Sequence, residues 1–402
     1  MCEAQRTLRH LLLGLPDTGI DNVISQLDSN ILPSDVFLNG LSLEHISTVK
    51  RACLVISTLA RHIILKEWQL AATLDILAGR DTILNASTGA GKTMLIILPM
   101  LLRPGSISIT VSPLKRLMSS QAVELGRYGL RAAIVNEDTS HDQELFNAIL
   151  NGYYDHVHIS PEQLQRHQGH FTRFYHLLDK PAFRQRIQVI NIDEGHEAGR
   201  AALGLDDFRS SYARLCTFRL KLPRNIPFVV LSATLPHHII SPLSKFLLLN
   251  DPKETRLCLN RSNIYYAVKP LITGTKEFRN LSLLVPDSAT QLNSLRKTII
   301  FFDDKRELDG ACRFLRKEYA RLMDPTSGKH QIPPAARTLV MGYHSDMSST
   351  YLRSTYEDFN VPDGSCKILC ATACAATVSP VRASPVFLHK ADGVSGSRFP
   401  MR

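Results

Sequence analysis

The sequence predicts an α/β protein whose parallel sheets are covered by helices on both faces. Short, nearly continuous apolar runs alternate with longer stretches of helical periodicity, as in buried parallel strands joined by helices. A glycine-rich segment directly follows the first run, where a phosphate-binding loop is expected. The predicted strands of this series are Thr82–Asn85, Ile107–Ser112, Ala132–Asn136, His156–Ser160, Val189–Asp193 and Phe228–Ser232.

A second, shorter series of strands follows residue 260. Its predicted strands are Thr298–Phe302, Thr338–Met341 and Lys367–Ala371, with a helix over Arg306–Leu322 and a Pro- and Gly-containing loop at Met323–Pro334. We therefore expect a second, incomplete α/β lobe.

Residues 1–60 are expected to be mainly helical, because apolar residues recur at helical spacing over Leu41–Leu65. The predicted organisation is a helical N-terminal extension over residues 1–60, a first lobe over 61–255 and a partial second lobe with a divergent tail over 256–402.

Composition limits the classes of protein. The 402 residues are 44% hydrophobic, which is enough for two cores, and the formal net charge of +10 suits a polyanionic partner or a merely basic protein. The eight cysteines are scattered, which favours a reducing compartment, and Cys366, Cys370 and Cys374 lack a second ligand cluster for zinc. The longest apolar run, Met94–Leu102, is too short to span a bilayer, so no membrane association is expected.

The strongest motif is the segment Ala86–Thr93, which lies between a predicted strand and a helix that begins near Lys92. Glycines let backbone amides surround phosphate oxygens, and the helix N-terminus adds its positive dipole end. Lys92 is expected to contact the β- and γ-phosphates of ATP, and Thr93 to ligate Mg²⁺. The alternative is a chance glycine-rich turn. The predicted nucleotide contacts in this loop are Ser87, Thr88, Gly89, Ala90, Gly91, Lys92 and Thr93.

An acidic pair, Asp193 and Glu194, ends the strand Val189–Asp193. Open α/β sheets bind ligands at the carboxyl ends of their strands. Asp193 is expected to hold Mg²⁺ and Glu194 to polarise the attacking water, so Lys92, Asp193 and Glu194 form the predicted catalytic set. The alternative is a solvated acidic turn. The small residues Ser232–Thr234 follow another strand end and are a weak signal alone.

These three motifs, in this order, resemble those of superfamily 2 helicases, and further segments resemble the RecQ family within it. The resemblance extends over about residues 65–372. The segments that carry it are Lys66–Gln69, Gly79–Asp81, Ser112–Leu114 with Leu117, Met118 and Gln121, Ser160–Glu162, Phe208–Arg209 with Tyr212 and Leu215, Arg261–Ile264 with Tyr266, Thr298–Phe302, and Tyr343–Ser345 with Arg353.

The resemblance implies two RecA-like lobes that use ATP and Mg²⁺ to move 3′ to 5′ on single-stranded DNA and to unwind duplexes, including those with a 3′ overhang. It makes Gln69 the adenine contact and His196, Ser232 and Thr234 coupling residues, and it implies a nuclear location. The nucleic-acid contacts that it implies are Ser112, Pro113, Lys115, Ser160, Pro161, His344 and Arg353.

The chain departs from the RecQ pattern after Thr372. The segment Ala373–Val378 lacks the expected glycine and aspartate, and no later Gln…Gly-Arg…Arg motif supplies an arginine finger, which is worth about a thousandfold or more in rate. The loop after His196 has no tryptophan, since Trp68 is the only one in the chain.

Three alternatives stay open. The first is a non-enzymatic module that binds ATP or DNA, based on the missing arginine motif. The second is an RNA helicase of the DEAD-box kind, against which His196 stands at the fourth position of the acidic motif. The third concerns the gene: the tail from Ala373 onward is expected to come from a different reading frame or an unspliced piece. The sequence leaves the oligomeric state open.

Overall fold

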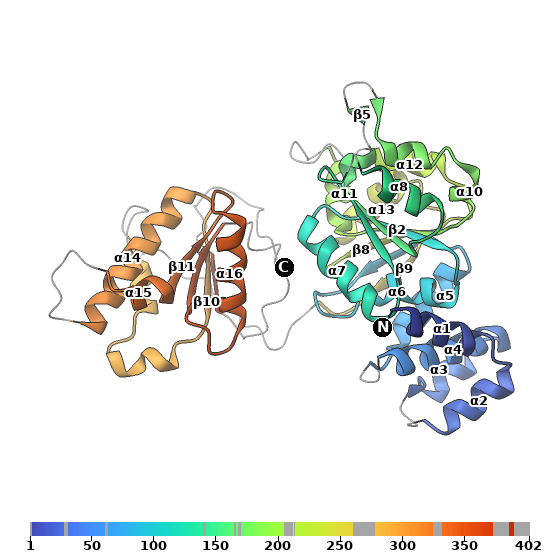
Figure 1. Ribbon diagram of the computed structural model, residues 1–402, viewed down its shortest axis with the longest axis horizontal. Helices are drawn as coiled ribbons and strands as arrows, with labels where there is room; N and C mark the ends of the chain where they lie inside the picture. Colours follow the sequence, from blue (N-terminus) through green and yellow to red (C-terminus); the bar gives the residue numbers. More distant parts are fainter. Residues whose placement is uncertain are drawn as a thin grey trace. The chain divides into compact units, whose positions relative to one another are not determined.

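The computed structural model divides into two compact units, Met1–Asn260 and Arg261–Pro400 (Figure 1). It describes residues 2–27, 31–60, 63–139, 142–164, 166–167, 170–204, 212, 214–259, 278–324, 332–372 and 386–389. Several sequence interpretations lie outside these ranges, namely those on Phe208–Arg209, on Arg261–Ile264 with Tyr266, and on the segment Ala373–Val378. Among the helices described, none combines the length and the apolar character that crossing a bilayer requires.

The first unit is built on a seven-stranded, entirely parallel sheet of order β3-β4-β2-β7-β8-β1-β9. The predicted α/β class is confirmed, and each predicted strand of the first series is present. The strands are β1 (Thr82–Asn85), β2 (Ile107–Val111), β3 (Ala132–Val135), β4 (His156–Ile159), β7 (Ile187–Ile192), β8 (Phe228–Ser232) and β9 (Lys253–Arg256). Strand β9 was not predicted, because it is a polar, largely exposed edge strand.

Helices cover both faces of this sheet, and alternate strand residues enter the two resulting cores. One core joins Val189, Val229 and Leu231 to the helices α4 (Leu43–Leu59), α5 (Glu67–Leu77), α6 (Met94–Leu102) and α7 (Lys115–Arg127). The other core joins Ile190 and Val230 to the helices α8 (Gln143–Leu150), α9 (Arg173–Leu177), α10 (Pro181–Arg184), α11 (Gly195–Ala202), α12 (Leu215–Lys221) and α13 (His237–Phe246). A small hairpin, β5 (Arg166–His167) with β6 (His170–Phe171), extends from this unit.

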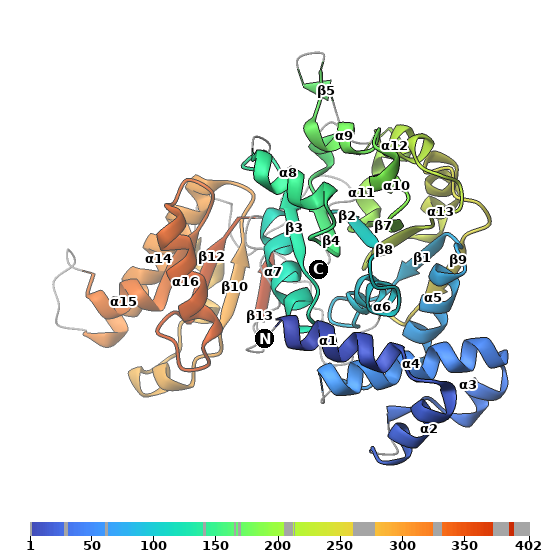
Figure 2. The same ribbon diagram turned by 45° about the vertical axis from the view of Figure 1, so that its right-hand side comes forward.

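The N-terminal helices form part of the first unit (Figure 2). Helices α1 (Cys2–Leu13), α2 (Asp17–Ser25) and α3 (Asp35–Asn39) precede α4, which packs against α5 and α6. An ion pair of 3.1 Å between Arg6 and Asp155 also ties α1 to the residue before β4. The extension therefore covers the side of the sheet on which α6 lies.

The second unit contains a parallel four-stranded sheet of order β11-β12-β10-β13. Its elements are β10 (Thr298–Phe301), β11 (Val340–Tyr343), β12 (Ile368–Ala371), β13 (Val386–His389), α14 (Lys305–Met323), α15 (Pro334–Leu339), α16 (Ser349–Asn360) and the 3₁₀ helices η4 (Phe278–Leu284) and η5 (Ala289–Ser294). The strand predicted at Thr338–Met341 begins two residues later, because the turn of helix that starts at Pro334 continues to Leu339. Strand β13 was not predicted.

A buried carboxylate, Asp81, connects several segments at the edge of the first sheet where the amino end of β1 lies. Asp81 is 2% exposed and accepts hydrogen bonds from the Arg219 guanidinium (3.1 Å) and from the backbone amides of Phe228 (2.7 Å) and Asn250 (2.8 Å). The Arg219 guanidinium also lies 4.5 Å from the centre of the Phe228 ring. One side chain thus joins the start of β1 to α12, to β8 and to the segment before β9.

We predict that Asp81→Ala destabilises the first unit by about 3–5 kcal/mol, because it leaves the buried Arg219 charge unpaired. Urea unfolding followed by circular dichroism measures the loss. The matched control is Asp75→Ala, which removes the more exposed 3.2 Å ion pair with Arg80 and is expected to cost less than about 1 kcal/mol. Equal losses in the two variants would contradict the assignment.

Candidate nucleotide-binding site

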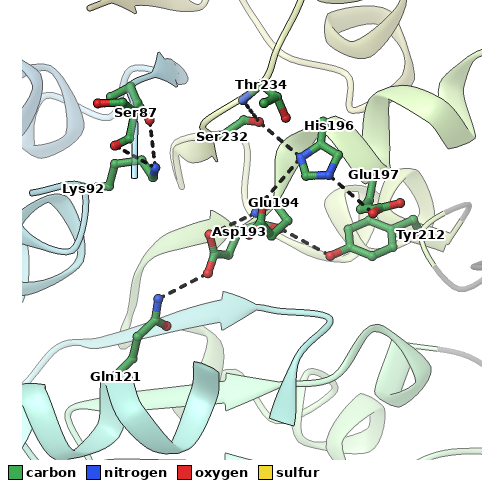
Figure 3. Close-up of polar contacts among 11 residues, drawn as sticks. Ser87, Lys92, Gln121, Asp193, Glu194, His196, Glu197, Tyr212, Ser232 and Thr234 are labelled. Carbon is green, nitrogen blue, oxygen red and sulfur yellow. Dashed lines mark hydrogen bonds and ion pairs between the residues drawn. The ribbon is translucent and has the colours of Figure 1, made fainter. Parts of the chain in front are cut away.

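Polar side chains collect at the carboxyl edge of the first sheet. Parallel strands all present their carboxyl ends at the same edge, so residues distant in sequence meet there. The residues that end or directly follow six of the strands are Asn85, Ser112, Asn136, Ser160, Asp193 and Ser232, and all six are buried. The sequence motifs for phosphate and for magnesium are thereby brought to one edge (Figure 3).

The loop Ala86–Thr93 follows β1 and leads into α6. Gly89 and Gly91 have φ values of 81° and 100°, a backbone conformation that favours glycine. Helix α6 begins at Met94, two residues later than predicted, and its first turn is tightened by a 3.0 Å bond from the Ile96 amide to the Thr93 carbonyl. Within the described residues, the amides of Gly89 and Gly91 donate to no protein acceptor. The loop is therefore built to receive an anion through its backbone.

The Lys92 ammonium group folds back over this loop. It donates to the carbonyl oxygens of Ala86 at 2.8 Å and Ser87 at 3.3 Å (Figure 3). Burial and the charge of Glu194 raise the pKa of Asp193, and the positive charge of Lys92 offsets a small part of this rise. An ammonium group in this place can bind a phosphate oxygen after exchanging carbonyl partners. The structure brings Lys92 and Asp193 to the same edge of the sheet although they are distant in sequence.

Gln69, the predicted adenine contact, is hydrogen-bonded to the loop. Its amide nitrogen donates to the Gly91 carbonyl at 2.9 Å, and its amide oxygen accepts from the Lys66 backbone at 2.8 Å. A Cβ atom at Gly91 would lie 2.6 Å from this amide nitrogen, so residue 91 must be glycine for the contact to form. The structure therefore shows Gln69 as a support of the phosphate loop, and its contact with adenine stays a prediction.

Asp193 is a buried carboxylate with both oxygens engaged. Oδ1 accepts from the Glu194 amide at 2.9 Å, and Oδ2 accepts from the Gln121 amide nitrogen at 3.2 Å. Burial, followed by the neighbouring charge of Glu194, raises the pKa of Asp193 to about 6. A bound divalent cation would favour the ionised form of this carboxyl, as the chemistry of a magnesium ligand requires.

Glu194 has a strained backbone, with a φ of 52° in the left-handed region. The next residue, Gly195, opens α11, and a Cβ atom there would lie 2.2 Å from a methyl carbon of Val230. The chain can therefore turn this sharply only because residue 195 has no side chain. Such strain is common at functional sites and here fixes the place of the Glu194 carboxylate.

A short polar network connects the acidic motif to β8. The Nδ1 atom of His196 lies 3.3 Å from the Glu194 carboxylate and 3.3 Å from the Ser232 hydroxyl, which accepts from the Thr234 amide at 3.1 Å (Figure 3). The Nε2 atom of His196 lies 3.4 Å from Glu197. The three residues that the RecQ resemblance assigns to coupling are thus joined to one another, while the coupling role itself stays a prediction.

The residues expected to contact nucleic acid fall into two groups. Ser112 and Ser160 have side chains that are 0% and 4% exposed, and Pro161 is also buried, whereas Lys115 at the start of α7 is exposed. The Lys115 ammonium pairs with Glu137 at 2.6 Å and with Asp138 at 2.8 Å. Any contact made by Ser112, Ser160 or Pro161 must therefore use backbone groups or follow a rearrangement, whereas Pro113 is half-buried.

His344 and Arg353 belong to the second unit. His344 is buried, with its Nε2 atom 3.8 Å from Asp309, and Arg353 is exposed and pairs with Glu357 at 3.3 Å. The roles of these residues stay predictions.

Sequence reasoning assigned no role of their own to two residues that touch the acidic motif. Gln121 contacts the Asp193 carboxylate, and the Tyr212 hydroxyl donates to the Asp193 carbonyl at 3.3 Å. The available signal for Gln121 was its helical spacing from Met118 and Leu125, which places a polar residue on the buried face of an amphipathic helix.

Mg²⁺ fits the oxygen chemistry of this site. The Thr93 hydroxyl and the Asp193 carboxylate are the oxygen ligands that Mg²⁺ prefers, and the ion commonly keeps several waters. Buried oxygen atoms nearby without a protein partner, on Ser112 and Gln121, can accept hydrogen bonds from such waters. Within the described residues, no group of three or more His, Cys, Asp or Glu side chains offers a cage for another metal ion, and Cys366 and Cys370 are buried free thiols.

Comparison with known proteins shows a family to which the first unit is similar. The model of the DEAD/DEAH box helicase family matches residues 66–241, which contain the loop, the acidic pair and the Ser232–Thr234 segment. This segment of the chain is therefore similar to the DEAD/DEAH box helicases. Members of this family use ATP.

RecQ-type helicases are among the proteins to which this chain is similar. The chain is 28% identical over 198 residues to the ATP-dependent DNA helicase Q-like 2 of Arabidopsis thaliana, covering 48% of this chain and 27% of that protein. It is 26% identical over 224 residues to the ATP-dependent DNA helicase Q1 of Rattus norvegicus, covering 54% of this chain and 34% of that one. The chain thus spans about a third or less of the length of these relatives.

Solved helicase structures share the fold. A DUF1998 helicase, MrfA, bound to DNA and AMPPNP matches with a TM-score of 0.60 at 15% identity, covering 83% of this chain and 45% of that one. Dbp5 of S. cerevisiae bound to RNA and ADP BeF3 matches with a TM-score of 0.51 at 17% identity, covering 85% and 76%. The RecA-like helicase fold predicted from the sequence is confirmed.

We predict that Asp193→Asn stabilises the nucleotide-free helicase domain at pH 8, by an amount on the order of 2 kcal/mol. Burial raises the pKa of Asp193 in the folded state to about 6, above the ordinary carboxyl value of 3.8, so ionisation opposes folding at high pH. The advantage of the variant should therefore shrink as pH falls below about 6 and vanish near pH 4. Urea unfolding in EDTA over this pH range measures it, and a variant that is less stable at every pH would contradict the prediction.

Proposed function

We propose that this chain binds ATP with Mg²⁺ and hydrolyses it to move 3′ to 5′ along single-stranded DNA and to separate duplex strands, as a helicase of the RecQ type. The observation that carries the proposal is the position of the Lys92 loop opposite the Asp193–Glu194 pair at one edge of the sheet. The two halves of a phosphoryl-transfer site, a phosphate cradle and a metal carboxylate, are thereby combined.

Each of these residues has a distinct task in the proposed reaction. The amides of the Ala86–Thr93 loop and the Lys92 ammonium bind phosphate oxygens, and Thr93 and Asp193 hold Mg²⁺, which neutralises charge on the phosphates. Glu194 orients the attacking water and receives its proton. The strained backbone of Glu194 and its contact with His196 hold this carboxylate in one place.

Exposed basic groups are the proposed phosphate contacts in each unit taken by itself. Lys115 in the first unit is exposed, Arg353 in the second unit is exposed, and the net charge of the chain is +10. Such contacts go to phosphates, so binding should be independent of sequence and weaken as salt rises.

The names of the relatives favour DNA over RNA as the proposed substrate of this chain. The Arabidopsis and rat relatives are named as DNA helicases, although a relative named as a putative RNA helicase, R290 of Acanthamoeba polyphaga mimivirus, is 27% identical over 194 residues. A nuclear location is proposed on the RecQ resemblance alone.

A non-enzymatic role is the second candidate. It is favoured by the missing Gln…Gly-Arg…Arg motif, because the transferring phosphoryl group would lack an arginine to stabilise its charge. Such a chain would bind ATP and DNA and perform no work.

We predict DNA-stimulated ATP hydrolysis that is abolished in Lys92→Ala and reduced about a hundredfold or more in Glu194→Gln, with nucleotide binding retained only in the latter. Phosphate release by the purified chain is measured with oligo-dT, with a matched oligo-U and with neither. The matched control is Lys180→Ala, which removes an exposed lysine remote in sequence from the motifs.

The outcomes separate the candidates. Turnover stimulated by oligo-dT supports the DNA helicase, and stimulation by oligo-U alone supports the RNA helicase. Binding that depends on Lys92 without turnover supports the non-enzymatic role, and activity that survives Lys92→Ala contradicts the assignment of the site.

A further inference from the structure

Helix α7 has one polar side chain on its buried face. Met118, Gln121 and Leu125 are its buried residues, and Gln121 is 9% exposed. The Gln121 side-chain oxygen is buried without a hydrogen-bond partner in the described part of the chain. Burying a polar group in this way costs free energy, so an apolar residue would pack at less cost unless the amide has a task.

The contact of the Gln121 amide nitrogen indicates that task. It donates at 3.2 Å to Oδ2 of Asp193, while the other oxygen of that carboxylate accepts from the Glu194 amide. The orientation of the carboxylate is therefore set from two sides, by its own backbone and by α7. Figure 3 shows Gln121 reaching Asp193 from a different element than the one that carries the acidic motif.

The first residue of α7 is Lys115. Gln121 lies six positions further along the chain, which is about 9 Å along a helix. The Lys115 ammonium is held by Glu137 and Asp138, two carboxylates that a nucleic-acid phosphate can replace. One short helix thus has at its first residue a lysine that could bind a nucleic-acid phosphate. Less than two turns later it has a side chain that contacts the proposed magnesium ligand Asp193.

We propose that Gln121 is a positioning residue that fixes the Asp193 carboxylate for Mg²⁺ and connects it, through α7, to polyanion binding at Lys115. The proposal rests on the proposed function. It adds that polyanion binding at Lys115 regulates the binding of Mg²⁺ at the same site. The amide nitrogen holds the Asp193 carboxylate, and the amide oxygen, which has no partner in the described residues, would be available to a hydration shell around the ion. When a phosphate draws Lys115 away from Glu137 and Asp138, the movement of α7 changes the support that Gln121 gives to Asp193.

The experiment measures the Mg²⁺ concentration that half-saturates binding of a fluorescent ATP analogue to the full chain, with and without oligo-dT. Gln121→Met keeps the length of the side chain and removes both hydrogen-bonding atoms, and Gln121→Leu is a second variant of similar volume. The matched control is Ser120→Ala, which changes an exposed residue on the same helix. Thermal unfolding of each variant checks that the fold is kept.

We expect Gln121→Met to raise the half-saturating Mg²⁺ concentration about tenfold, because residues that orient metal ligands typically contribute ten- to a hundredfold to metal affinity. Oligo-dT should shift this concentration in the native chain and in Ser120→Ala, and the shift should be lost in Gln121→Met and in Lys115→Ala. A purely structural role would lower the unfolding temperature without moving the Mg²⁺ dependence.

An unchanged Mg²⁺ dependence in both Gln121 variants, with nucleotide still bound by the native chain, would overturn this inference and leave the proposed function standing. A native chain that binds no nucleotide at any Mg²⁺ concentration would overturn both.

Discussion

The parallel arrangement of the strands in the first sheet is the constraint on which the site depends. Because β1, β2, β4, β7 and β8 all run in one direction, their carboxyl ends lie at one edge, and the residues that follow them must meet there. The phosphate loop after β1 and the acidic pair after β7 are brought together by this topology. The Asp81 carboxylate stabilises the opposite edge by joining β1 to β8 and α12.

The site edge contains costly features that the cores do not require. Asp193 and Gln121 are buried polar side chains, Glu194 has a left-handed backbone, and Val230 leaves no space for a side chain at Gly195. A protein selected for stability alone would be expected to avoid them, since each opposes folding. Their concentration in one place is best explained by a ligand whose charge and hydrogen bonds compensate for them.

Much of the fold could be predicted, because buried parallel strands are recognisable as apolar runs. Val189–Asp193 and Phe228–Ser232 were found in this way, whereas β9 was missed because its residues are polar and pair at an exposed edge. The phosphate loop and the acidic pair were found because short motifs determine their chemistry. Gln121 was seen only as part of a nucleic-acid motif, because the face that a helical residue presents to a distant strand end depends on tertiary packing. The burial of Ser112 and Ser160 could not be predicted from the sequence either, since small polar residues occur both in exposed loops and at covered strand ends.

The most direct test of the central claim is the affinity of the purified chain for ATP, measured by calorimetry with Mg²⁺ and with EDTA. The account predicts binding that needs Lys92 and is strengthened by Mg²⁺ only while Asp193 is present, so that Asp193→Ala removes the effect of the metal and Lys92→Ala removes binding. Binding that is indifferent to Mg²⁺ and persists in Lys92→Ala would show that the loop and the acidic pair do not act as one site, and would contradict the account.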